Sequence, residues 1–199
     1  MAGATAGGNI MNNKTKKMVG VGLFTAIVVV LQLLGGGIKV GGLFSISLVL
    51  VPIVVGAAVY SWKAGAWLGL AFGTAVLVSG DAAIFLGISF WATVAVVLMK
   101  GMLCGLAAGF IYALLRRWNS VVAVIAAAVT CPVVNTGIFL IGCQLFFMED
   151  ITQWAAMYGY PNVAEYMFFG LAGINFLVEI ATNIVLAPVI TRLIRVGTH

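Results

Sequence analysis

The sequence predicts an all-α membrane protein with six transmembrane helices, and three observations lead to this fold class. Hydrophobic residues make up 63% of the 199 residues, and charged residues make up only 8%. The mean hydropathy is +1.20, far above that of a soluble domain. The apolar residues also fall into six runs separated by polar or glycine-rich links. We therefore expect one six-helix transmembrane domain over residues 14–199, preceded by a leader or disordered extension over residues 1–13.

The first three expected spans lie in the N-terminal half of the chain. A cluster of lysines precedes Met18–Leu34, and a glycine-rich link, Gly35–Gly42, separates this span from Leu43–Tyr60. Lys63 then leads into the shorter third span, Ala64–Ser79. The glycine-rich link lacks the Lys-Ser/Thr pair of a phosphate-binding loop, so we expect a flexible outer loop there.

The last three expected spans are longer. Ser89–Leu115 is closed by two arginines, and Val121–Phe147 contains a proline, which removes one backbone donor. The polar stretch Met148–Tyr166 follows, and the sixth span, Met167–Ile190, ends near two further arginines. Because a helix rises about 1.5 Å per residue, these runs are long enough to cross a hydrocarbon core of about 30 Å.

The charged residues divide between the two sides of the expected bundle. If the N-terminus lies in the cytoplasm, the inner side holds eight cations and the outer side holds only Lys39, as the positive-inside rule requires. We therefore expect both termini on the cytoplasmic side of a bacterial cytoplasmic membrane. The basic residues anchor the chain at the lipid bilayer and do not indicate nucleic-acid binding. The expected inner cations are Lys14, Lys16, Lys17, Lys63, Arg116, Arg117, Arg192 and Arg195, and the outer acids are Asp81, Glu149, Asp150 and Glu165.

Several classes of site conflict with the residue types present. Cys104, Cys131 and Cys143 lie inside apolar runs without a CxxC pair, which argues against a disulfide framework or a zinc site. The only histidine is His199, and no serine, histidine or paired-aspartate constellation suits an intramembrane enzyme. We expect no catalytic residue, no metal and no cofactor.

Two ionisable side chains, Lys100 and Glu179, lie deep in the expected spans. Lys100 is about 15 Å from the start of its helix and Glu179 is about 18 Å below the outer end of its own, so they share a level. A lone charge at that depth costs at least a few kcal/mol. Asn175, Glu179 and Asn183 recur every four residues and share one helix face. The sequence leaves two interpretations open: a structural ion pair with bridging asparagines, or a pocket that opens to the outside and binds a polar solute.

Other polar and aromatic residues are candidates for the same pocket. Asn135 follows Pro132 at mid-depth in the fifth span, and Gln144 lies nearer its outer end. Trp154 lies in the outer polar stretch, where a lid and an ordinary interfacial aromatic belt are equally compatible with its position. The expected substrate-binding residues are Lys100, Asn135, Asn175, Glu179, Gln144, Lys39, Asp81 and Trp154.

Small residues share one face of the first span. Gly22 and Ala26 are four residues apart, a spacing that lets another helix approach closely. From this spacing alone, packing within the chain and docking of a partner helix are both open.

Together, the lysine-led first span with Gly22 and Ala26, the six-segment layout and the stretch CPVVNTGIFLIG from Cys131 to Gly142 resemble a known family. From Met11 to Arg195 the chain is similar to the substrate-binding S component of energy-coupling factor (ECF) vitamin transporters. The resemblance implies a six-helix protein that binds a vitamin from outside. It also implies docking on a transmembrane coupling subunit that works with two ATPase subunits.

By the same resemblance, Lys100, Asn135, Asn175 and Glu179 fall in the ligand pocket. The docking positions correspond to Gly22, Ala26 and Val30, where the family's fullest pattern has three alanines.

The identity of the solute is a separate question. One cation with carboxamides suits a solute that carries one carboxylate with hydroxyls or amides, so pantothenate is the first candidate. Riboflavin, folate, lipoate or a queuosine precursor are alternatives. A different class, an autonomous secondary carrier or channel, would use Glu179 as a proton-coupling carboxylate.

Overall fold

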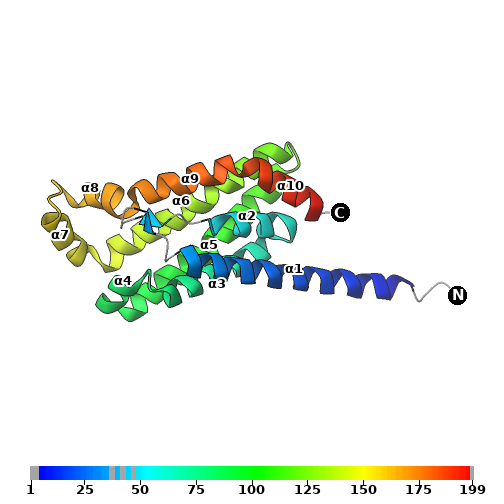
Figure 1. Cartoon of the computed structure of the whole chain (residues 1–199), viewed down its shortest axis with the longest axis horizontal. Coiled ribbons are helices and arrows are strands. Elements are labelled where there is room, and N and C mark those ends of the chain that lie inside the picture. The colour runs from blue at the N-terminus through cyan, green and yellow to red at the C-terminus, as the bar shows by residue number, and fades with distance from the viewer. Residues whose placement is uncertain (1–4, 36–38, 41–43, 46–47, 198–199) are drawn as a thin grey trace.

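The computed structural model describes residues 5–35, 39–40, 44–45 and 48–197, and this part of the chain is almost entirely helical. The long helices run along one axis, with both termini at one end of the molecule and α4 and α7 at the other (Figure 1). The elements are α1 (Thr5–Gly35), β1 (Lys39–Val40), β2 (Phe44–Ser45), α2 (Leu50–Val59), α3 (Trp62–Ser79), α4 (Ala83–Ile88), α5 (Phe90–Leu115), α6 (Ser120–Phe146), α7 (Met148–Met157), α8 (Val163–Glu165), the π-helix η1 (Tyr166–Gly173), α9 (Ile174–Val185) and α10 (Ala187–Gly197).

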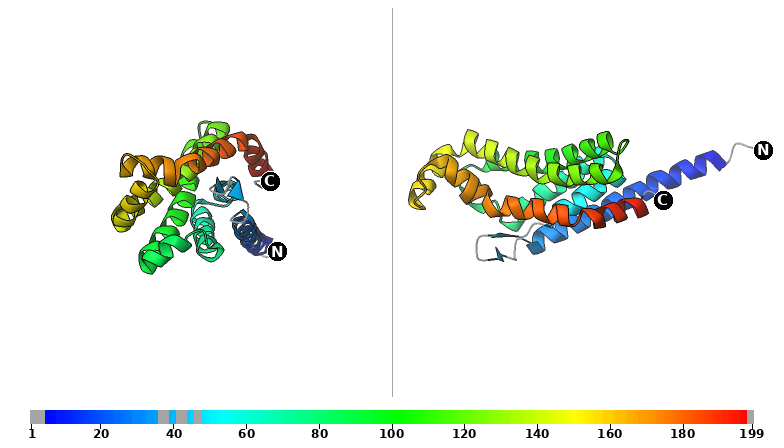
Figure 2. Two further views of the ribbon diagram at one scale, coloured as in Figure 1. Left: turned by 60° about the vertical axis from the view of Figure 1, so that its left-hand side comes forward. Right: turned by 90° about the horizontal axis from the view of Figure 1, so that it is seen from above.

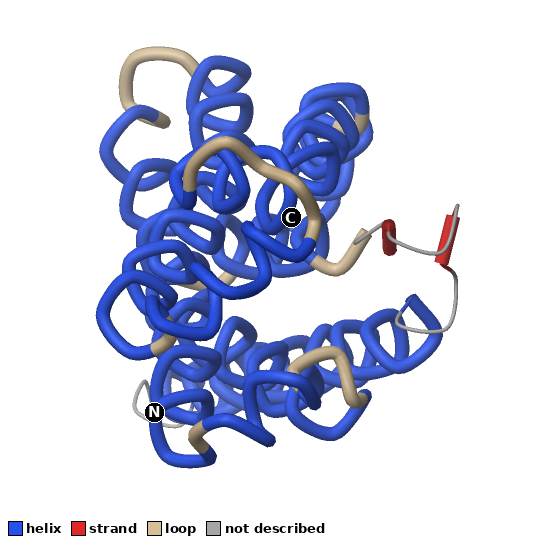
Figure 3. Tube along the Cα trace, turned by 90° about the vertical axis from the view of Figure 1, so that its left-hand side faces the viewer, coloured by secondary structure: helices blue, strands red, loops and turns tan. Residues whose placement is uncertain are grey.

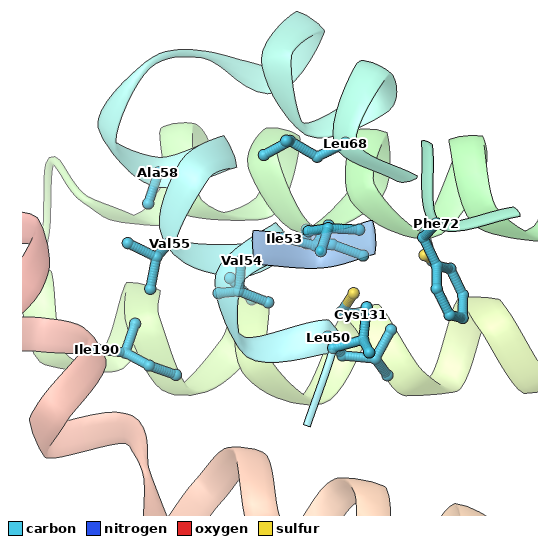
Figure 4. Close-up of a cluster of buried hydrophobic side chains, with 14 of the residues drawn as sticks. Leu50, Ile53, Val54, Val55, Ala58, Leu68, Phe72, Cys131 and Ile190 are labelled. Atoms are coloured by element: carbon cyan, nitrogen blue, oxygen red, sulfur yellow. The ribbon is translucent and has the colours of Figure 1, made fainter. Parts of the chain in front are cut away.

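The short helix α2 lies at the centre of the bundle. Its side chains interdigitate with those of α3, α6 and α10, and Figure 4 shows Ile53 and Val55 among them. Almost every residue of α2 is buried, which suits its uninterrupted apolar composition. The second expected span therefore needs correction: its described helix begins at Leu50, and ten residues reach only about 15 Å.

Glycines set the close contact between α3 and α5. A Cβ added at Gly69 would overlap the main-chain oxygen of Gly101, and a Cβ at Gly65 would overlap that of Gly105. At Gly73 the added Cβ would lie 2.7 Å from the Val97 main-chain oxygen. Glycines four residues apart on both helices thus let the backbones touch, the small-residue packing that membrane helices use.

The sixth expected span is not one continuous α-helix. It starts as the π-helix η1, bends by 42° at Gly173 (φ 24°), and continues as α9. The chain turns again at Leu186 into α10, where Pro188 is in the first helical turn. Ile190 and Ile194 on α10 are buried against the core. The span predicted to end at Ile190 therefore ends near Val185, and an amphipathic helix follows it.

Three described helices are long and apolar enough to cross a membrane, namely Lys14–Gly35 of α1, α5 and α6, and the bent pair η1 and α9 adds a fourth if counted as one span. The prediction of an all-α membrane fold is confirmed. The count of six spans and the side on which the termini lie stay predictions.

The segment between α1 and α2 contains a two-residue antiparallel pair in which Lys39 faces Ser45 and Val40 faces Phe44. This pair lies at the edge of the helices (Figure 3) and beside the end of α1 (Figure 2). The rest of the expected outer loop is outside the described residues. Helix α1 begins at Thr5, within the expected leader or disordered extension over residues 1–13. The boundary expected after residue 13 stays a prediction.

Candidate solute-binding site

A cavity of about 650 Å³ lies between the helices toward the α4 end of the molecule. Its wall is made by residues from α1, α3, α4, α5, α6, η1 and α9. Five of the expected site residues meet there, although they come from four separate parts of the chain: Asp81, Lys100, Asn135, Asn175 and Glu179.

The position of Lys100 follows from the register of α5. Thr93, Val96, Val97 and Lys100 share one helix face, and all four line the cavity. The next residue, Gly101, faces α3 and fixes the rotation of the helix. The Lys100 Nζ atom lies 5.2 Å from the centroid of the Phe139 ring, in a cation–π contact.

Glu179 and the asparagines of α9 divide between the cavity and the protein interior. Asn175 and Glu179 line the cavity, and Glu179 is only 5% exposed. Asn183 is fully buried, and its Nδ2 atom donates to the main-chain oxygen of Glu179 at 2.9 Å. Asn183 therefore supports the helix, whereas its two neighbours on the stripe line the cavity.

Some buried amide oxygens have no partner. Among the described residues, the Oδ1 atoms of Asn135, Asn175 and Asn183 lack a hydrogen bond. An unsatisfied buried acceptor costs about 1–3 kcal/mol. Asn135 and Asn175 also line the cavity, whereas Asn183 does not.

A hydrogen-bonded cluster closes one side of the cavity and was not predicted in full. Asp81 Oδ2 accepts hydrogen bonds from Gln32 Nε2 at 2.6 Å and from Ser79 Oγ at 3.0 Å. Gln32 is 6% exposed and joins α1 to the end of α3. Its signal in the sequence was a lone amide inside an apolar run.

Aromatic rings cover the cavity at the α4 end. The Phe85 ring centroid lies 5.6 Å from that of Phe139 and 5.1 Å from that of Phe147, and all three residues line the cavity. Trp154 packs on Phe85 at 5.7 Å but is not part of the wall. It therefore supports the aromatic cover from behind.

Two other expected site residues lie elsewhere. Gln144 is exposed and lies outside the cavity wall. It is nine residues after Asn135 on α6, which places it about 180° around the helix. The backbone of Lys39 lies in β1, but its side chain is outside the described residues.

The small-residue face of α1 is open. Gly22, Ala26 and Val30 are exposed, and a Cβ added at Gly22 would meet no atom within 4 Å. Helix α1 packs on the chain through a different face, where Thr25 accepts a hydrogen bond from the Trp67 ring nitrogen at 3.2 Å. The interpretation of Gly22 and Ala26 as internal packing residues is therefore not supported.

Candidate metal ligands are scarce at the site. Within the described ranges, no group of three His, Cys, Asp or Glu side chains could hold a metal ion.

Long apolar helices around an internal polar cavity define a multi-pass membrane protein. A family model described as "ECF transporter, substrate-specific component" matches residues 16–191. The chain therefore belongs to the family of substrate-specific S components of ECF transporters. Members of this family are substrate-binding subunits of transporters rather than enzymes, and they work with membrane and ATPase subunits. No curated protein and no solved structure matches the chain significantly.

Proposed function

We propose that this chain captures a small water-soluble vitamin or similar micronutrient at the outer face of a bacterial cytoplasmic membrane. It then delivers the solute inward together with an ECF coupling subunit and two ATPase subunits. The observation that carries this proposal is the cavity whose wall contains both Lys100 and Asn135.

The chemistry of the wall favours a solute with one carboxylate. Lys100 is the only cation among the described cavity-lining residues, so a second carboxylate, as in folate, would lack a partner. Asn135 and Asn175 line the same cavity and carry carboxamides, which can bond hydroxyl or amide groups. Pantothenate combines these groups and is the first candidate.

The proposed orientation places the α4 end outward. The termini lie at the opposite end (Figure 1), and the turns that carry Lys63 and the pair Arg116 and Arg117 lie there too. Cationic turns of this kind favour the cytoplasmic side. In this arrangement six segments cross or enter the bilayer, and the exposed face of α1 at Gly22, Ala26 and Val30 docks on the coupling subunit.

The direct test is binding of pantothenate to purified chain by isothermal titration calorimetry. Loss of a hydrogen bond to a charged group costs about 1.5–3 kcal/mol, so Lys100→Met should weaken binding about 10- to 150-fold. Lys63→Met removes an exposed lysine and should leave the affinity unchanged. Equal affinity of Lys100→Met and wild type would remove Lys100 from the site. Uphill transport by the chain alone would contradict the role as a subunit.

A further inference from the structure

The carboxylate of Glu179 lacks a hydrogen-bond donor. It faces the cavity from α9, and no described residue donates to it, because the amide of Asn183 bonds the Glu179 main-chain oxygen instead. Asp81 differs, since Gln32 and Ser79 already donate to its carboxylate. The cavity therefore contains one acid that the protein satisfies and one that it leaves open.

Lys100 and Glu179 are opposite charges that do not pair. Both line the same cavity. Yet among the described residues their nitrogen and oxygen atoms form no ion pair within 4.0 Å. Buried charges are costly unless they are paired or bound to a partner. Two separated poles in one cavity are what a ligand that bridges them would need.

The charge of the wall also restricts the ligand. With all groups ionised, Lys100 contributes one positive charge against the two negative charges of Asp81 and Glu179. A solute with a carboxylate and no donors would neutralise Lys100 but leave Glu179 without a partner. A solute that also brings N–H or O–H donors would satisfy both poles.

Building on the proposed function, we propose that the captured solute carries an anionic group at one end and hydrogen-bond donors at the other, and that Glu179 binds the donor end. An anionic group binds the Lys100 ammonium, and hydroxyl or amine donors at the other end bind the Glu179 carboxylate. The carboxamides of Asn135 and Asn175, two residues of the cavity wall whose buried Oδ1 atoms have no partner, bind further polar groups of the solute after a change of rotamer. The apolar body between the poles packs against rings such as Phe139 and Phe176, which line the same space.

This assignment separates the candidate solutes by chemistry. Pantothenate meets both requirements, because its hydroxyl groups lie at the end opposite its carboxylate. An amino-carboxylate zwitterion meets them as well. Lipoate carries a carboxylate but no N–H or O–H donor at its other end, so it should not bind tightly. Panthenol, in which an alcohol replaces the carboxylate of pantothenate, lacks the group for Lys100.

The test combines one chemical identification with one matched pair of variants. Full-length chain is purified without added vitamin, and mass spectrometry identifies and quantifies the small molecule retained. We expect a molecule with an anionic group at one end and N–H or O–H donors at the other. Glu179→Gln keeps the shape of the side chain and should retain at least tenfold less of it. Glu149→Gln, which changes an exposed acid on α7, should retain as much as wild type.

The outcomes distinguish this inference from the proposed function. A retained solute without donors overturns the inference, and this result requires no variant to fold. Retention that falls in Lys100→Met but is unchanged in Glu179→Gln also overturns it, while the proposed capture function stands. If wild-type chain retains no small molecule and binds neither pantothenate, panthenol nor lipoate in titration, the proposed function fails and the inference falls with it.

Discussion

The contact between α3 and α5 predicts that a single added methyl group destabilises the fold. In Gly69→Ala the new Cβ would overlap the main-chain oxygen of Gly101, and no side-chain rotation can relieve a collision with backbone. Overpacking of this kind costs about 1–3 kcal/mol. Replacing glycine by alanine in a helix contributes about 1 kcal/mol in the opposite direction. Because the overlap involves backbone, we take the upper end of the cost and expect a net loss of about 2 kcal/mol.

Gly137→Ala is the matched control, because a Cβ added there on α6 meets no atom within 4 Å. It should be neutral or stabilising by up to about 1 kcal/mol. The stability of both variants and of wild type is compared by thermal unfolding in detergent. Unfolding is monitored as loss of the monodisperse peak in size-exclusion chromatography. Gly69→Ala should therefore be less stable than both wild type and Gly137→Ala. If Gly69→Ala is as stable as Gly137→Ala, the close contact that aligns α5 is not present.

Two further predictions concern α1. Ala26→Trp should leave pantothenate binding unchanged but abolish uptake by the assembled transporter, because Ala26 is exposed on the small-residue face. The control Ile141→Trp, at an exposed site on α6, should retain uptake. Uptake by Ala26→Trp at the wild-type rate would contradict docking through this face. Gln32→Leu removes the 2.6 Å hydrogen bond to Asp81 and should lower the stability by about 1.5–3 kcal/mol in the same thermal assay. An unchanged melting temperature would show that this hydrogen bond contributes nothing to stability.

The polar residues of the site could be predicted where helix geometry alone determines their position. Lys100 and Glu179 had to lie at one level, because each is a known number of residues from the end of its span. The four-residue spacing of Asn175 and Glu179 placed both on one face. Lys100, Asn175 and Glu179 all line the cavity. Gln144 failed because its depth was considered without its rotation, although nine residues of helix turn it away from Asn135.

Other features depended on tertiary contacts that hydropathy does not report. The run from Met167 to Ile190 is apolar throughout, so hydropathy alone does not report its bend at Gly173 or its turn at Leu186. The partner of Asp81 was also hidden, since Gln32 lies 49 residues earlier in the chain. Periodicity locates a face of a helix but does not say which helix will meet it.

The register of α5 links the fold to the site. Lys100 and Gly101 are successive residues and point about 100° apart, so the close contact with α3 turns the lysine toward the cavity. The glycine repeat alone would permit a slide of four residues, about 6 Å, with similar contacts. A contact with a third helix is not part of this repeat: Val96 packs against Gly142 of α6, where its Cγ1 atom would lie 2.6 Å from an added Cβ. The repeated glycine contacts therefore set the direction of Lys100, and contacts outside the repeat, such as Val96 with Gly142, restrict its depth.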